Sequence, residues 1–239
     1  MYFSKKSYKV IPLSEDFAVK ENNISAGLPA HETVYRALRE RILFGELTPG
    51  QAVTIQGLID QLGAGMTPVR EAIRRMTAEG ALVFQGNRRV CVPILSQANL
   101  DELAFARSAL EKQLVFLAAQ RATPEDISHL RTIDAALDGA ILRGDVGTYL
   151  RHNYEFHKAL YRMANAPILT HLADGLWLRY GPSLRVVCGR LGTQNLVDQH
   201  KQAIDAMASK DARAASEAMA ADVIQGMDQV ALALHQKEK

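Results

Sequence analysis

Apolar residues recur at helical spacing in two short, neighbouring stretches of the chain. In residues 55–62 they mark one face of a short helix, and in residues 69–76 they mark one face of a second helix. Between the two lies Gly63-Ala64-Gly65, where glycine can turn the chain with positive φ. Thr67-Pro68 then offers an N-cap followed by a proline at the first helical position. This order of signals predicts a helix-turn-helix.

The flanking segments extend this prediction to a larger domain. Residues 34–42 form a third helical stripe that ends near Gly45. Downstream, residues 81–84 and 90–92 are β-prone runs on either side of the arginine-bearing segment 85–89. Three helices followed by a hairpin are typical of a winged helix-turn-helix, in which the second helix of the motif enters the DNA major groove.

From Gln97 onward the pattern is helical almost throughout, which predicts a mainly α protein whose C-terminal part is an all-α bundle. Six helices are expected, at residues 97–121, 124–142, 145–164, 166–187, 193–209 and 211–236. We divide the chain into an N-terminal arm (1–29), a winged domain (30–95) and a helical bundle (96–239). The break at 93–96 is short, so we expect it to couple the two domains mechanically.

Charge and cysteine content narrow the class of protein. The 239 residues carry 28 basic and 26 acidic side chains, too even a balance for a protein that binds nucleic acid over its whole surface. Residues 67–89, however, hold five arginines against two glutamates, which is a local basic patch. Two cysteines, Cys91 and Cys188, do not make a disulfide scaffold. With no apolar run of membrane-spanning length and no apolar signal core, we expect a cytoplasmic location without membrane contact.

Two stretches, LRERILFGELTPG (38–50) and TPVREAIRRMTAEGAL (67–82), resemble the GntR family of transcription regulators. The order of the domains resembles the FadR branch of that family, whose C-terminal FCD domain senses ligands. Six bundle helices are similar to the shorter, VanR-type variant. The supporting bundle motifs are ARSALEKQLVFLAAQRA (106–122), NYEFHKAL (153–160), HKQAIDAM (200–207) and DARAASEAMAAD (211–222).

The DNA-binding candidates lie on the helix-turn-helix and the wing. The arginines of the second helix of the motif are candidates because that helix would enter the major groove. The resemblance implies that Thr67 and Arg70 contact DNA and that positions 56, 66, 88 and 89 lie at the interface. The full set is Gln56, Met66, Thr67, Arg70, Arg74, Arg75, Arg88 and Arg89. The family usually has arginine at positions 56 and 66, serine at 65 and glycine at 89, so we expect an operator that differs from the usual one. An ordinary helical hairpin with a solvated arginine face is the alternative.

Asn153 and His157 are four residues apart and therefore share a helix face. Many FCD domains hold a divalent metal with an aspartate and three histidines, and the resemblance implies that these positions correspond to Asn153, His157, His200 and Asp222. One carboxylate, two imidazoles and an amide oxygen could bind Zn, Ni or Mn. A metal-free polar pocket is the alternative.

Arg107 precedes Glu111 by one helical turn, so the pair is either a surface ion pair or part of a cavity. In FCD domains the matching arginine often faces the cavity, where it would grip the carboxylate of a small organic acid. Arg179 and Asn195 are expected to line the same cavity. Trp177 is expected to serve core or interface packing.

These features predict a homodimeric transcription factor whose affinity for a double-stranded DNA operator changes when a small acid or a metal complex enters the bundle. A metal-dependent hydrolase is the second hypothesis, because two histidines and a carboxylate also describe catalytic zinc. The sequence has no HExxH, GxSxG or P-loop motif, so we expect no enzyme activity. An architectural DNA-binding protein is a third hypothesis, but it would not need a large bundle with inward polar groups.

Overall fold

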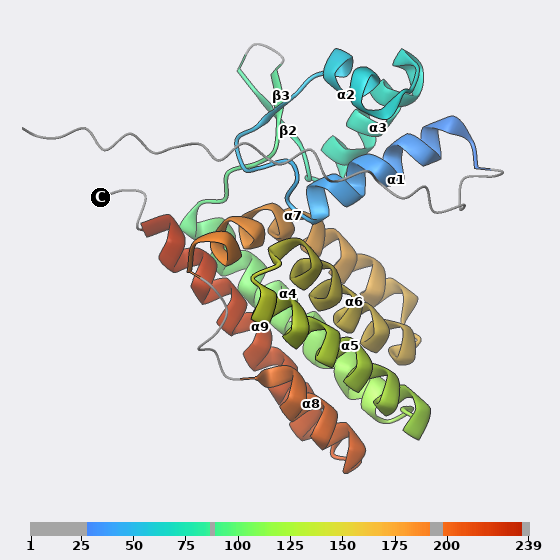
Figure 1. The fold of residues 1–239 in the computed structure, drawn as a ribbon, viewed down its shortest axis with the longest axis vertical. Coiled ribbons are helices and arrows are strands. Elements are labelled where there is room, and N and C mark those ends of the chain that lie inside the picture. The colour runs from blue at the N-terminus through green and yellow to red at the C-terminus, as the bar shows by residue number, and fades with distance from the viewer. Residues whose placement is uncertain (1–27, 87–88, 192–197, 236–239) are drawn as a thin grey trace, which may run out of the picture.

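The computed structural model describes residues 28–86, 89–191 and 198–235. A small domain of three helices and a hairpin lies across one end of a bundle of long helices (Figure 1). The mainly α architecture and the order of the two parts agree with the prediction.

The N-terminal domain is a winged helix-turn-helix. Its elements are α1 (Ala30–Leu43), β1 (Ala52–Val53), α2 (Ile55–Leu62), α3 (Met66–Ala78), β2 (Val83–Gln85) and β3 (Arg89–Cys91). The three strands are antiparallel in the order β1-β3-β2, and Phe84 pairs with Val90 in the hairpin. Thr54 caps α2 by accepting a hydrogen bond from the Gly57 N–H at 3.0 Å. Leu38, Val69 and Met76 are buried where the helices meet.

The start of α3 differs from the prediction. Gly65, not Thr67, is the N-cap residue, and the helix begins at Met66. Pro68 then lies within the first turn, where its missing N–H removes no intrahelical hydrogen bond. Thr67 is exposed at this helix start.

The described part of the C-terminal domain contains the six predicted helices. They are α4 (Gln97–Ala119), α5 (Pro124–Arg143), α6 (Val146–Ala164), α7 (Pro167–Leu191), α8 (Gln199–Ala208) and α9 (Ala212–His235). Capping boxes at Ser96 and Thr123 start α4 and α5. The helix expected at 193–209 is present from Gln199, while residues 193–197 lie outside the described residues.

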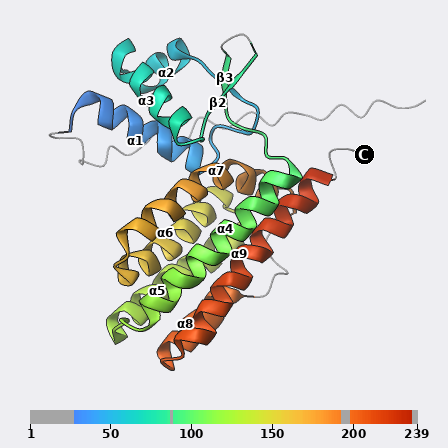
Figure 2. The ribbon, with the colours of Figure 1, turned by 180° about the vertical axis from the view of Figure 1, so that it is seen from behind.

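Helix α4 is the centre of the bundle. It packs against α6, α7 and α9, and it runs antiparallel to α9 along most of its length (Figure 2). Leu114, Val115 and Ala118 are fully buried on α4. None of the helices in the described ranges is both long and apolar enough to cross a membrane.

Candidate metal site and DNA interface

Two histidines and an aspartate meet inside the bundle. His157 lies on α6, His200 on α8 and Asp222 on α9, and one candidate ligand atom from each lies within 4.8 Å of the others. Both histidines are buried, and the Asp222 side chain is 22% exposed. Three segments distant in the sequence therefore converge at one point, which lies where the resemblance implied a metal site.

The histidines turn the same ring atom toward the aspartate. His157 Nε2 is 3.3 Å from one Asp222 carboxylate oxygen, and His200 Nε2 is 3.6 Å from the other. Neither Nε2 atom has a hydrogen-bond partner among the described residues, although both are buried. An unpaired buried polar atom costs about 1–3 kcal/mol. A divalent cation between the three side chains would satisfy both nitrogens, so the residues present fit a metal.

The other ring nitrogen of each histidine, Nδ1, faces a second carboxylate. His157 Nδ1 is 2.6 Å from a Glu111 carboxylate oxygen, and His200 Nδ1 is 3.5 Å from an Asp134 carboxylate oxygen. When Nδ1 donates to a carboxylate, the Nε2 lone pair is free for a metal, which is the usual arrangement around metal-ligating histidines. Sequence reasoning missed the roles of Glu111 and Asp134, because they depend on how α4 and α5 are placed beside α6 and α8.

Asn153 is buried one helical turn before His157. Residues four apart on a helix share a face, so its amide lies on the same side of α6 as the imidazole. Its role as a fourth ligand stays a prediction.

The electrostatics of the site favour a bound cation. Burial lowers the pKa of His157, but the Glu111 and Asp222 carboxylates more than reverse this and raise it to about 9. Burial raises the pKa of Asp222, but the two histidines outweigh that effect and lower it to about 2. In the metal-free protein at neutral pH, the His157 ring is therefore protonated on both nitrogens and positively charged. A metal ion that binds to Nε2 would displace the proton on that nitrogen.

Arg107 is buried beside this site. Its guanidinium pairs with Glu111 at 2.8 Å and lies 4.2 Å from the centre of the Trp177 ring and 4.6 Å from that of Tyr180. The alternative of an exposed surface pair is therefore wrong. Trp177 is buried, as predicted. Burial raises the pKa of Glu111, but Arg107 and His157 outweigh it and keep the pKa below its usual value, so this carboxylate is charged.

The two other predicted effector residues do not join this cluster. Arg179 Nε donates a hydrogen bond to the backbone oxygen of Glu79 at 3.2 Å, at the end of α3 in the winged domain. The expectation that Arg179 lines the bundle cavity is therefore wrong. Trp177 and Tyr180 take the inward face of α7, and Arg179 lies between them on the outward side. Asn195 lies outside the described residues.

The first half of α3 presents a free basic surface. Met66 is 51% exposed, and Thr67 and Arg70 are also exposed. No hydrogen bond or ion pair holds Arg70 within the described ranges. Arg74 is exposed as well, but it pairs with Glu71 at 2.8 Å. Side chains at the N-terminal end of such a helix are the ones that reach base edges.

Arg75 is held within the winged domain. Its guanidinium lies 3.5 Å from the centre of the Tyr35 ring and pairs with Glu32 at 3.1 Å and Glu79 at 3.2 Å. These contacts tie α3 to α1 and favour a structural role for Arg75.

The remaining DNA-binding candidates lie on α2 and the wing. Gln56 is exposed and donates to Asp60 at 2.8 Å. Arg89 is exposed at the start of β3, and Arg88 lies outside the described residues.

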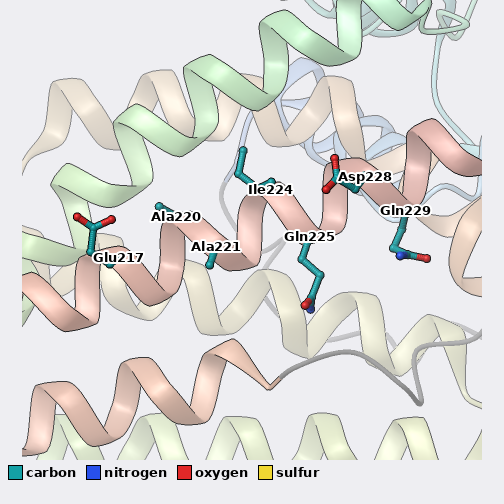
Figure 3. Close-up of a pocket in the computed structure, with 7 residues that line it drawn as sticks. All are labelled: Glu217, Ala220, Ala221, Ile224, Gln225, Asp228 and Gln229. Carbon is teal, nitrogen blue, oxygen red and sulfur yellow. The ribbon is translucent and has the colours of Figure 1, made fainter.

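A shallow groove of about 490 Å³ follows the outer side of α9, away from the histidines. Figure 3 shows Ala220, Ala221 and Ile224 along it, with Glu217 near one end and Asp228 nearer the other. Asp222 is not among the residues that line it, because it points into the bundle. The groove is therefore a separate surface feature.

Comparisons with known proteins agree with this architecture. Residues 30–92 match the family of bacterial regulatory proteins called gntR, and residues 102–224 match the FCD domain. The HTH-type transcriptional regulator McbR of Escherichia coli K12 is 31% identical over 177 residues, which cover 73% of this chain and 80% of McbR. The Nta operon transcriptional regulator of Aminobacter aminovorans is 36% identical over 111 residues, which cover 46% of this chain and 51% of that protein.

Solved structures show the same fold. The structure of E. coli McbR superimposes with a TM-score of 0.78 at 28% sequence identity. The match covers 89% of this chain and 100% of the McbR chain. A GntR regulator from Rhodococcus sp. RHA1 superimposes with a TM-score of 0.70 at 20% identity and covers 84% of this chain and 96% of that one. The chain is therefore a transcriptional regulator of the GntR family, with an FCD domain as its C-terminal bundle.

Proposed function

We propose that this regulator binds a divalent metal in its bundle and that a small organic acid, bound at the metal, alters its affinity for a DNA operator. The observation that carries the proposal is the pair of buried Nε2 atoms that have no hydrogen bond within the described residues and face one carboxylate. Zn, Ni or Mn suits these ligands, with Asn153 as a further oxygen donor. Four protein ligands leave room for the carboxylate of an effector on a metal that accepts five or six ligands, and the buried Arg107 adds positive charge nearby.

The direct test measures operator binding in three states. A duplex selected from a random library by the metal-free protein serves as the operator. Its affinity is measured for the metal-free protein, for the zinc-loaded protein, and for the zinc-loaded protein with small mono- and dicarboxylic acids. We expect a shift in affinity of about 5- to 150-fold, the usual range of allosteric coupling. Equal affinity in all three states would refute regulation through this site.

Arg70 should contribute strongly to operator binding. Its exposed guanidinium has no partner among the described side chains, so it is free to contact a base edge or a phosphate. We expect Arg70→Ala to weaken operator binding by about 1–3 kcal/mol. Arg213→Ala is the matched control, because Arg213 is an exposed arginine at the start of α9, far from the winged domain. Equal losses in both variants would show that Arg70 acts only through net charge.

Met66 should help to set the sequence preference. It stands exposed at the start of α3, where the family usually has arginine. Met66→Arg is expected to shift the selected operator toward guanine at one position of each half-site, because arginine binds guanine with two hydrogen bonds. The measurement is selection from a random library with both proteins. An unchanged preference would mean that position 66 does not read bases.

We propose that the protein acts as a homodimer through the outer face of α4 and α9. Lys112 on α4 pairs with Glu217 on α9 at 2.6 Å. Because the helices run antiparallel (Figure 2), Phe105 and Ile224 lie at the same level, seven residues beyond this pair on each helix. Phe105 is 79% exposed, and the small alanines of the α9 groove lie next to Ile224 (Figure 3). This apolar face supports association of two copies.

Phe105→Glu is expected to convert the dimer to a monomer at micromolar concentration, because it places two charges in an apolar interface. Sedimentation equilibrium measures the change. Leu142→Glu is the matched control, since Leu142 on α5 is 83% exposed and lies away from this face. A Phe105→Glu protein that remains dimeric would place the interface elsewhere.

The hydrolase alternative gains no support from the relatives named above, which are transcriptional regulators. We propose that the bundle site serves regulation in the cytoplasm. The zinc-loaded protein can be assayed for hydrolysis of ester and amide substrates. Hydrolysis that disappears when His157 and His200 are replaced by alanine would reverse this assignment.

A further inference from the structure

Helix α7 packs against α6, which carries His157, and against α1 of the winged domain, and Figure 1 shows it at the end of the bundle that meets the winged domain. On its inward side, the Trp177 ring centre is 4.9 Å from that of His157. Its outward side packs against α1. One helix therefore touches both the sensor site and the DNA-binding domain.

Two arginines of α7 hold the ends of two winged-domain helices. Arg179 Nε donates to the backbone oxygen of Glu79, the C-cap residue of α3, at 3.2 Å. Arg185 Nη1 donates to the backbone oxygen of Phe44, the C-cap residue of α1, at 3.3 Å. Carbonyl groups at a helix C-terminus have no intrahelical partner and carry the negative end of the helix dipole, so a guanidinium stabilises them.

Glycines allow these contacts to be very close. A Cβ at Gly80 would lie 2.5 Å from Arg179 Nη2, and a Cβ at Gly45 would lie 2.6 Å from Arg185 Cβ. On α7 itself, a Cβ at Gly181 would lie 2.0 Å from the Leu43 carbonyl oxygen. At Gly181 two backbones meet, so a shift of α7 there displaces the end of α1, whereas the end of α3 is reached through the Arg179 side chain.

A chain of aromatic rings runs beside the arginines. The ring centres of Phe44 and Tyr154 are 5.9 Å apart, those of Tyr154 and Trp177 are 5.4 Å apart, and both pairs meet edge to face. Trp177 in turn meets His157 edge to face. Such pairs have a preferred geometry, so these rings form a packed connection from His157 to the end of α1.

Helix α7 also has a point at which it can bend. Pro182 lies within the helix, between the two arginines. Proline has no N–H, so the backbone hydrogen bond to Leu178 is missing there. A change of bend at Pro182 would alter the relative positions of the arginine contacts to α3 and α1.

We infer that α7 and the ring of Tyr154 carry the signal from the metal site to the winged domain. Arg179 and Arg185 are the positioning residues that hold the recognition helix and its neighbour. The inference rests on the proposed function in taking metal binding as the signal. Its test distinguishes a failure of metal binding from a failure of the coupling through α7.

The test uses zinc alone as the probe and two readouts besides DNA binding. Trp177 is the one tryptophan of the 239-residue chain, so its fluorescence reports the state of the site. Hydrogen exchange of peptides spanning residues 40–47 and 76–82 reports the ends of α1 and α3. In the wild type, zinc should change Trp177 emission, the exchange of both peptides and, by about fivefold or more, operator affinity.

The informative variant is the double substitution Arg179→Gln with Arg185→Gln. It should retain the zinc affinity and the Trp177 response within about twofold, while the exchange response is lost and the operator shift falls below twofold. Arg121→Gln is the matched control, because Arg121 also donates to a backbone oxygen at a helix end, that of Ala164 in α6, but within the bundle. The control should keep every wild-type response.

A double variant with the full exchange response and operator shift would overturn the inference. If zinc leaves Trp177 emission and thermal stability unchanged, the metal part of the proposed function fails instead. The coupling is then tested by perturbing the site with Asp222→Asn, which should alter exchange at residues 40–47 in the wild-type background and not in the double variant. If Asp222→Asn changes the exchange of residues 40–47 equally in both backgrounds, the inference is also overturned.

Discussion

Replacing both His157 and His200 with alanine is expected to weaken zinc binding by more than about 100-fold. Loss of a residue that only hydrogen-bonds to a metal ligand costs up to about 100-fold, and loss of two ligands should cost more. The two rings supply two of the three ligand atoms of the cluster, so only Asp222 and the proposed Asn153 ligand would remain. In the wild type, zinc at a hundredfold excess over its dissociation constant should add about 2.7 kcal/mol to the free energy of unfolding. A chelator should remove this gain and leave the double variant unchanged. Chelator competition and thermal unfolding provide the measurements.

His129→Ala with His171→Ala is the matched control, because both histidines are exposed on other faces of the bundle. This control should bind zinc like the wild type. Since the pKa of His157 is raised to about 9, zinc must displace a proton, and its affinity should rise about tenfold per pH unit between pH 7 and 9. Tight, chelator-sensitive binding that survives in the His157/His200 variant would show that the cluster is a metal-free polar core.

Replacing Glu111 with leucine is expected to destabilise the metal-free protein by about 3–5 kcal/mol, the cost of removing one partner of a buried ion pair. Glu111 is fully buried and lies between the guanidinium of Arg107 and the imidazole of His157. Without it, two cationic groups remain in the core with one fewer counter-charge. Urea denaturation, followed by Trp177 fluorescence, measures the change in the free energy of unfolding.

Two further variants define the cause. Glu155→Leu removes an exposed glutamate that is 3.3 Å from His152, and it should cost less than about 1 kcal/mol. Combining Arg107→Met with Glu111→Leu should recover much of the lost stability, because it removes the stranded guanidinium. If the single Glu111 variant is as stable as the wild type, the buried charges do not depend on one another.

Local sequence signals predicted most of the secondary structure, although strand β1 (Ala52–Val53) was not expected. Helix starts at Ser96 and Thr123 depend on a side chain that reaches the backbone three residues later, and the αL turns at Gly63 and Gly144 follow from the absence of a Cβ. These interactions span few residues, so they can be read directly along the chain. The start of α3 was misplaced because Gly65 took the capping position that Thr67-Pro68 also offered.

The sequence by itself therefore determined a winged helix-turn-helix, six bundle helices and, through the family resemblance, the candidate ligands His157, His200 and Asp222. Only the tertiary structure decided what surrounds them. Glu111 meets His157 across 46 residues of chain, and Arg179 reaches Glu79 across 100. Helical periodicity fixes which residues share a face, but not which neighbouring helix that face meets. Burial of Arg107 and the turn of Arg179 toward the winged domain follow from that packing alone.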